Sequence, residues 1–167
     1  MRRLLAALVL GLTCLAVSHG EVTSHRTAFE PPQVQPLNLE HETSFVVFPA
    51  DTNANPPMAF GGKLFSEMDR CAAIACRRLL YASSNAKDAV TANVEVKYHK
   101  PAQVKDLLFV HAVITRVGKT SIYVHVEILK EVNGSPFRAL IASADFTFVS
   151  FDVEKKIAIE HGVVIEK

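Results

Sequence analysis

Apolar and polar residues change their spacing near residue 90, and this change divides the chain into a helical part and a strand-rich part. Before it, residues 62–82 carry apolar side chains at helical spacing, with no proline or later glycine to interrupt them. After it, four long runs alternate with a period of two, at residues 90–99, 107–116, 120–131 and 138–151. These spacings predict one long helix followed by four strands.

One further strand is expected before the helix, because residues 43–48 are rich in valine, phenylalanine and threonine. A turn-rich loop, residues 51–57, separates this strand from the helix. The joins between the later strands are short and two of them contain glycine, at Gly118 and Gly134, which favours antiparallel hairpins in a four-stranded meander. The order of elements therefore predicts an α+β domain in which one helix packs on an antiparallel sheet.

The first twenty residues are typical of a targeting segment. Met1-Arg2-Arg3 supplies positive charge, and an apolar stretch follows over residues 4–17, which is short for a membrane span. We expect residues 1–20 to act as an export signal to the periplasm or the outside, while a retained anchor or an organelle-targeting role stays open. Residues 21–41, with three prolines, are expected to be an extended lead-in, and residues 42–167 the single domain.

Composition narrows the classes of partner. The formal net charge of +1 across 167 residues argues against nucleic acid, which needs a basic surface. Beyond the targeting segment no membrane association is expected. Without the first twenty residues only Cys71 and Cys76 remain, and their separation by five on one helix makes a disulfide between them improbable. The seven histidines show no metal-ligand spacing, so no metal is expected.

The predicted helix has a polar face and an apolar face, and one acid departs from this division. At about 100° per residue the charged residues, including Glu67, gather on one side, whereas Asp69 falls within the apolar stripe. A buried carboxylate must be paired, protonated or directed into a cleft, because its desolvation is costly. Three interpretations stay open: Asp69 pairs with a lysine or arginine of the sheet, it lies at the edge of the stripe, or it serves as a general base or a hydrogen-bonding acid.

The predicted helix begins at Phe60-Gly61-Gly62. Backbone N–H groups at a helix start are unpaired and lie at the positive end of the helix dipole, and glycine lets a ligand approach them. Such groups can stabilise a developing oxyanion. Gly61 and Asp69 are eight residues apart, which is roughly 12 Å along a helix. They cannot act on the same atom within one chain, so joint action in catalysis would require a neighbouring subunit.

Five stretches in collinear order resemble the hotdog-fold acyl-CoA thioesterases, the short bacterial and mammalian cytosolic-type acyl-CoA hydrolases. They are Pro49–Asn55, Phe60-Gly61-Gly62 with Met68-Asp69, Lys100–Asp106, Arg116–Ser121 and Phe146–Val149. The resemblance implies a sheet wrapped around one central helix, in a homodimer or a dimer-based tetramer or hexamer. It also implies hydrolysis of a small-molecule acyl thioester with no cofactor other than the CoA of the substrate.

The resemblance also assigns roles to individual residues. It implies that Asp69 is the general base or nucleophile and that a backbone N–H of Gly61 or Gly62 polarises the thioester carbonyl. It places substrate and CoA contacts at Asn55, Phe60, Lys119, Thr120 and Ser121. For the last three an ordinary hairpin turn is the alternative interpretation. Tyr98 and His99, near a strand end, are candidates to line a pocket.

Two departures from the family pattern keep other functions open. The segment Pro56–Ala59 is one residue longer than usual and lacks the polar side chain found there, and Lys105 replaces the glycine of a Val-Gly-Asp turn. The export-like start also differs from the intracellular location of CoA thioesters. A catalytically silent hotdog protein that binds an acyl ligand, or a hydratase-type hotdog, are therefore the alternatives.

Overall fold

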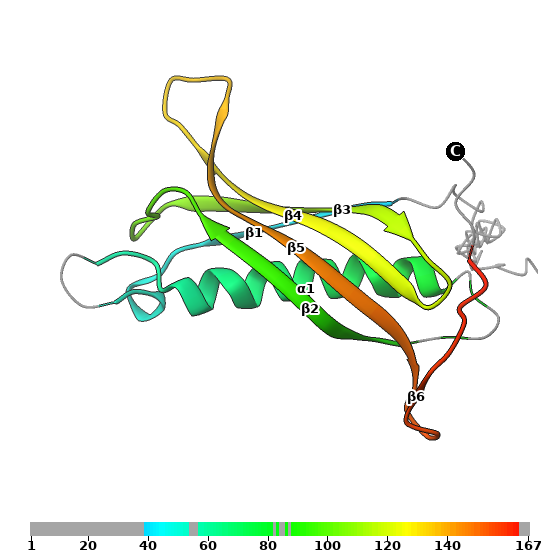
Figure 1. Cartoon of the computed structure of the whole chain (residues 1–167). Coiled ribbons are helices and arrows are strands. Elements are labelled where there is room, and N and C mark those ends of the chain that lie inside the picture. The colour runs from blue at the N-terminus through cyan, green and yellow to red at the C-terminus, as the bar shows by residue number, and fades with distance from the viewer. Residues whose placement is uncertain (1–38, 54–56, 82, 84–85, 87, 164–167) are drawn as a thin grey trace, which may run out of the picture. The chain divides into compact units, whose positions relative to one another are not determined.

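The computed structural model describes one compact unit of the chain, within residues 35–167. The described residues are 39–53, 57–81, 83, 86 and 88–163 (Figure 1). The expected targeting segment, nearly all of the lead-in, and Asn55 lie outside them. Within the described ranges, no helix has the length and apolar character needed to cross a membrane.

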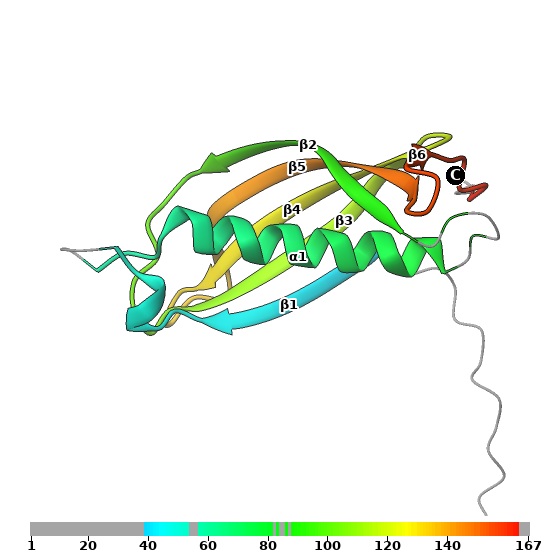
Figure 2. The same cartoon turned by 90° about the horizontal axis from the view of Figure 1, so that it is seen from below.

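Each helix and strand expected from the sequence is present, with bounds shifted by a few residues. In chain order the elements are β1 (Glu40–Val46), the short 3₁₀ helix η1 (Pro49–Asp51), α1 (Gly61–Leu80), β2 (Ala89–Tyr98), β3 (Leu107–Val117), β4 (Ser121–Glu131), β5 (Arg138–Asp152) and β6 (Ile157–Ala158). The antiparallel sheet curves around α1, which lies across its inner face (Figure 2). This arrangement confirms the predicted α+β hotdog architecture.

The predicted four-stranded meander is wrong at one position. The strand order is β1-β3-β4-β5-β2, so β2 pairs with β5 and not with β3. Residues 99–106 do not reverse the chain in a hairpin; they cross the ends of β5 and β4. Three inter-strand spacings amount to about 15 Å, which eight extended residues span easily. The short length of this connection therefore could not show whether it forms a hairpin or crosses the sheet. Because it crosses, β2 is an edge strand of the sheet.

The core confirms the alternation expected in the sequence. The inward side chains of β4 are at most 1% exposed and they meet the apolar stripe of α1: Ile122, Val124, Val126 and Ile128 against Leu64, Met68, Cys71, Ala72, Ala75 and Leu79. Phe146 and Phe148 of β5 stack in the same layer, with ring centroids 5.9 Å apart. This buried layer fixes α1 on the sheet and thereby determines which helix residues face each strand.

One of the two acids of α1 does not lie where the helical periodicity placed it. Glu67, expected on the polar face, is only 4% exposed, while Asp69 is half-buried at the edge of the apolar stripe, one of the positions left open. Lys63 Nζ lies 2.9 Å from Glu67 Oε1 and Arg70 also pairs with Glu67, so the buried carboxylate is compensated by two cations. A helix covered by a curved sheet buries more than half its circumference, which the periodicity alone did not reveal.

Both cysteines of α1 are buried and free, so the prediction of no disulfide between them is confirmed. Burial raises the pKa of the Cys71 thiol and raises the pKa of Cys76 to about 12. Because the thiolate is the reactive form, both thiols should resist alkylation at pH 8. We expect iodoacetamide to modify neither residue in the folded protein and both in urea, as measured by peptide mass spectrometry. Modification of Cys76 in the folded protein would contradict this burial.

Lys105 adopts a backbone conformation that suits glycine. Its φ is 73°, in a turn closed by a hydrogen bond from Asp106 N to Gln103 O at 3.1 Å. We expect Lys105→Gly to raise the free energy of unfolding by about 0.5–1 kcal/mol, since relief of the left-handed strain exceeds the entropy that glycine adds to the unfolded chain. Urea unfolding measures this. The control Lys100→Gly, at a position without positive φ, should lower stability.

Candidate active site

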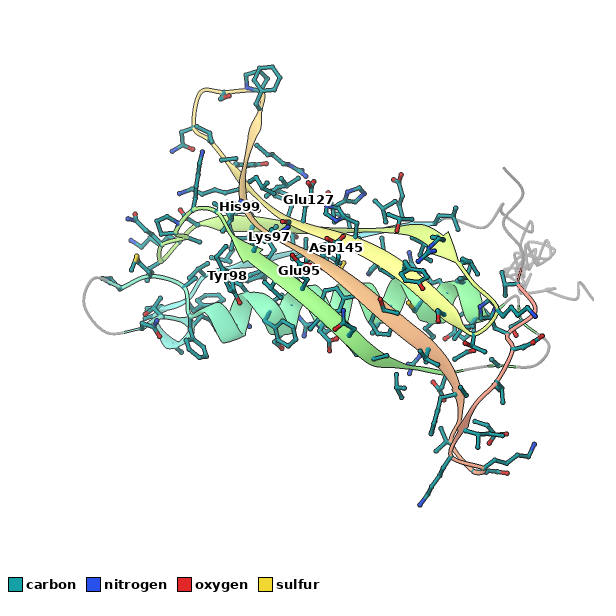
Figure 3. All side chains as sticks on the ribbon, viewed as in Figure 1. Glu95, Lys97, Tyr98, His99, Glu127 and Asp145 are labelled. Carbon is teal, nitrogen blue, oxygen red and sulfur yellow. The ribbon has the colours of Figure 1, made fainter. Side chains whose placement is uncertain are left out.

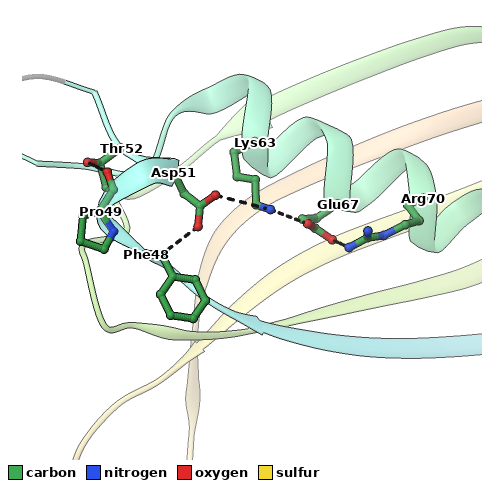
Figure 4. Close-up of polar contacts among 7 residues, drawn as sticks. All are labelled: Phe48, Pro49, Asp51, Thr52, Lys63, Glu67 and Arg70. Carbon is green, nitrogen blue, oxygen red and sulfur yellow. Dashed lines mark hydrogen bonds and ion pairs between the residues drawn. The ribbon is translucent and has the colours of Figure 1, made fainter.

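The loop before α1 holds the start of the helix in place (Figure 4). Asp51 Oδ2 accepts a hydrogen bond from Phe48 N at 2.9 Å, and the Asp51 carbonyl accepts one from Phe60 N at 2.8 Å. Lys63 Nζ adds an ion pair 3.5 Å from Asp51 Oδ1. The described part of the Pro49–Asn55 stretch is therefore structural here, because its hydrogen bonds determine where the helix begins.

The first two residues of α1 present backbone N–H groups ahead of the intrahelical ladder. The earliest bonds of the helix run from Lys63 N and Leu64 N to the Phe60 carbonyl, at 2.9 and 3.2 Å. The N–H groups of Gly61 and Gly62 precede these bonds, at the positive end of the helix dipole. The exposed Phe60 ring covers Gly62, where a Cβ would lie 2.4 Å from the ring. Backbone N–H groups ahead of the helical ladder are one requirement of an oxyanion site, and the Phe60 ring limits the approach to Gly62.

A pocket of about 350 Å³ lies beside Gly61, between the helix start and the end of β2. Tyr98 and His99, labelled in Figure 3, line it as expected from the sequence. The apolar side chains of Met58 and Leu64 also line it. Tyr98 Oη donates a hydrogen bond to the Gly61 carbonyl at 2.9 Å, and His99 Nε2 lies 2.9 Å from Ser143 Oγ. The pocket therefore joins an apolar wall to the helix N-terminus, as a thioester with an acyl chain would require.

Asp69 lies at the open edge of the sheet. Its Oδ1 accepts a hydrogen bond from Thr91 Oγ1 of β2 at 3.0 Å. The only strand paired with β2 in the described sheet is β5, so the far side of β2 faces outward next to Asp69. Over the described ranges no lysine or arginine forms an ion pair with Asp69. The carboxylate thus keeps acceptor capacity at an edge where a second chain can reach it.

Within one chain, Asp69 and the glycines remain apart. Asp69 is not among the residues that line the pocket beside Gly61. Along β2, Asp69 contacts Thr91 near one end while Gly61 contacts Tyr98 at the other end. The distance inferred from helical rise therefore agrees with the fold, and a single subunit does not assemble the two groups around one atom.

The predicted CoA contacts at Lys119, Thr120 and Ser121 lie at the opposite end of the helix. The Lys119 carbonyl accepts a hydrogen bond from His161 N at 3.2 Å, and the His161 carbonyl accepts one from Ser83 Oγ, just beyond the end of α1. A 20-residue helix is about 30 Å long, so this turn is far from Gly61 in the same chain. The structure brings these groups together with neither Asp69 nor the glycines.

Two features of the site had no clear signal in the sequence. Thr91, the hydrogen-bond donor to Asp69, becomes a neighbour of the helix only because β2 is an edge strand next to α1. The role of Glu67 in the helix–loop ion pairs depends on its burial, which the predicted polar face concealed. By contrast, the place of Tyr98 and His99 at the end of a predicted strand did indicate that they line a pocket.

The chain is similar to known thioesterases in sequence and in structure. The chain matches the family model described as "Thioesterase superfamily" over residues 57–136, which include α1, β2, β3 and β4. It is 37% identical over 115 residues to YkhA of Bacillus subtilis, which is named an uncharacterized acyl-CoA thioester hydrolase. This alignment covers 66% of the chain and 61% of YkhA, so the chain spans less than two thirds of that relative.

Solved structures show the same fold. The acyl-CoA hydrolase of Staphylococcus aureus, in complex with butyryl coenzyme A, coenzyme A and coenzyme A disulfide, superposes with a TM-score of 0.65 at 31% identity. The match covers 77% of this chain and 75% of that one. The hexameric thioesterase y2039 of Yersinia pestis has a TM-score of 0.60 at 30% identity, covering 71% and 92% of the two chains.

Proposed function

The chain belongs to the thioesterase superfamily, and we therefore propose that it hydrolyses acyl-CoA thioesters with Asp69 as the catalytic carboxylate. The relatives named as acyl-CoA hydrolases, one of them bound to CoA compounds, support this activity. CoA enters as part of the substrate, and no other cofactor is proposed. Export of the protein stays a prediction from residues 1–20.

One observation carries the proposal: Asp69 accepts a hydrogen bond from Thr91 at an open sheet edge and forms no ion pair within the described part of the chain. The interpretation in which a sheet lysine or arginine neutralises Asp69 would have favoured a silent acyl-binding protein. A carboxylate with free acceptor capacity can instead take a proton from water or attack a carbonyl carbon.

The reaction needs two contributions from the chain. Asp69 acts either as general base, taking a proton from the water that attacks the thioester carbon, or as nucleophile, forming an anhydride that water then opens. In both cases the carbonyl oxygen becomes an oxyanion, which the N–H of Gly61 or Gly62 stabilises. The C–S bond breaks, the CoA thiolate takes up a proton, and the products are the free acid and CoA.

A second subunit brings these contributions together when the β2 edges of two chains pair in antiparallel fashion. A two-fold axis between Val94 and Glu95 sets Thr91 opposite the partner's Tyr98. Because Asp69 lies at Thr91 and Gly61 at Tyr98, each carboxylate then faces the helix start of the other chain. This pairing also covers the exposed side chains of Val90 and Tyr98. We propose a homodimer of this kind, which can build a tetramer or a hexamer.

Hydrolysis of a panel of acyl-CoAs by the purified chain tests the activity, with release of CoA thiol followed by a disulfide reagent. Turnover of at least one chain length supports the proposal. Single-turnover hydrolysis in ¹⁸O-water separates the two roles of Asp69. If water opens the anhydride at the aspartyl carbon, the label enters the Asp69 carboxylate and the released acid stays unlabelled; if Asp69 is a general base, the label enters the released acid. A folded protein that binds acyl-CoA without turnover would instead establish the silent hotdog, and hydration of an enoyl-CoA the hydratase.

A further inference from the structure

A second pocket lies at the end of the sheet where the β2–β3 connection passes the base of the β4–β5 hairpin. Its volume is about 460 Å³, and three lysines line it: Lys100 and Lys105 from the connection and Lys130 from β4. The connection and β4 are separate segments of the chain, so the fold brings Lys130 next to Lys100 and Lys105. We call this cavity the lysine pocket.

The charges of the lysine pocket are unevenly compensated. Lys130 Nζ lies 2.7 Å from Asp106 Oδ1, and Asp106 Oδ2 accepts a hydrogen bond from Gln103 N, also at 2.7 Å. Both oxygens of Asp106 are therefore occupied, and its side chain is only 14% exposed. The other acid of the lining, Glu131, is exposed. Neither Lys100 nor Lys105 forms an ion pair with any residue that the structure describes, which leaves two ammonium groups available to an anion.

The backbone conformation at Lys105 is a second observation that points to an anion site. The turn holds Lys105 at a φ of 73°, with its N–H bonded to the Val47 carbonyl at 2.9 Å. Glycine would satisfy this turn with less strain. The hydrogen bonds of the turn are made by backbone atoms and the Asp106 carboxylate, and not by the Lys105 side chain. Compared with glycine, lysine therefore adds only a side chain with an ammonium group at the wall of the lysine pocket. A strained non-glycine residue beside a cavity points to a functional requirement for its side chain.

We propose that the lysine pocket binds a phosphate-bearing ligand through Lys100 and Lys105, with Lys130 held in place by Asp106. Ammonium groups bind phosphoryl oxygens as point charges through strong charge-assisted hydrogen bonds. The lysine pocket shares Lys100 and Pro101 with the pocket beside Gly61, so the two cavities are neighbours. The phosphates belong either to the CoA part of the substrate, which rests on the proposed function, or to a free phosphate compound.

Calorimetric titration of the full chain with pyrophosphate and with CoA, at fixed ionic strength, tests the binding. The key variant is Lys100→Gln combined with Lys105→Gly, which removes both free ammonium groups. We expect its Kd for both probes to rise at least 10-fold. Lys105→Gly alone removes one ammonium group while relieving backbone strain, so weaker binding by this variant cannot be attributed to unfolding. The matched control Lys97→Gln removes a lysine on the exposed side of β2 and should change Kd less than 2-fold.

Two substrates distinguish the sources of phosphate. If the phosphates are those of CoA, the double variant raises KM for acyl-CoA at least 10-fold. Lys105→Gly, at a residue that lines only the lysine pocket, also raises this KM but leaves hydrolysis of the same acyl group on N-acetylcysteamine unchanged. If the ligand is a free phosphate compound, pyrophosphate binding weakens while KM for acyl-CoA stays the same. Unchanged binding of pyrophosphate and CoA by the folded double variant would overturn the proposal. The titrations need no turnover, so they test the pocket even if the enzyme assignment fails.

Discussion

Replacing Asp69 by asparagine is expected to lower kcat/KM for acyl-CoA by about 10²-fold or more, equivalent to about 2.7 kcal/mol of transition-state stabilisation. The amide keeps the size of the carboxyl group and an oxygen that can accept the hydrogen bond from Thr91. It can neither take a proton from water nor form an anhydride. Folding should therefore persist while the chemistry is lost, as circular dichroism and steady-state kinetics on the same preparation would show.

Glu67→Gln is the matched control, because it removes the negative charge of another helix carboxylate two residues away. Glu67 pairs with Lys63 and Arg70 on the flank of α1 that faces β1, where Lys63 also lies 5.5 Å above the Phe45 ring. Asp69 lies on the flank that faces β2. We expect the control to retain activity within about 3-fold. Equal activity of Asp69→Asn and the unaltered chain would place the chemistry elsewhere.

The elements of the fold were predictable because their signals are local. Alternation in β4 and the helical stripe of α1 each depend on residues a few positions apart, and the buried side chains Ile122, Val126 and Met68 confirm both patterns. The pairing of β2 was not predictable in the same way. It depends on whether residues 99–106 turn back or cross the sheet, and both paths use the same short, polar segment.

The site was predictable in its parts but not in its environment. Asp69 was identified as an acid out of place, yet the neighbours that decide its chemistry, Thr91 and an open strand edge, follow from the topology of β2. Glu67 was misplaced for a related reason, since only the curvature of the sheet determines how far around α1 burial extends. The role of Lys105 likewise became visible only with its φ and the lysine pocket.

Mixed oligomers give the second large effect, and they test whether the site is shared between chains. One variant is Asp69→Asn, and the other is Gly61→Pro, in which proline removes the N–H of the helix start and is tolerated by the first turn of a helix. With Gly61 as the oxyanion donor, every site in an oligomer of a single variant lacks either the carboxylate or the N–H donor, so both preparations should be nearly inactive. An active Gly61→Pro protein would assign the donor to Gly62. Loss of one oxyanion donor alone is worth about 10²- to 10³-fold.

Refolding the two variants together as an equal mixture should restore activity if Asp69 of one chain acts with Gly61 of its partner. In each mixed dimer one site then combines the intact Asp69 of one subunit with the intact Gly61 of the other, while the second site carries both substitutions. Random pairing makes about half of the dimers mixed, and half of their sites intact, so about a quarter of the original activity should return. A site formed within one chain would gain nothing from mixing, since no subunit in the mixture contains both groups.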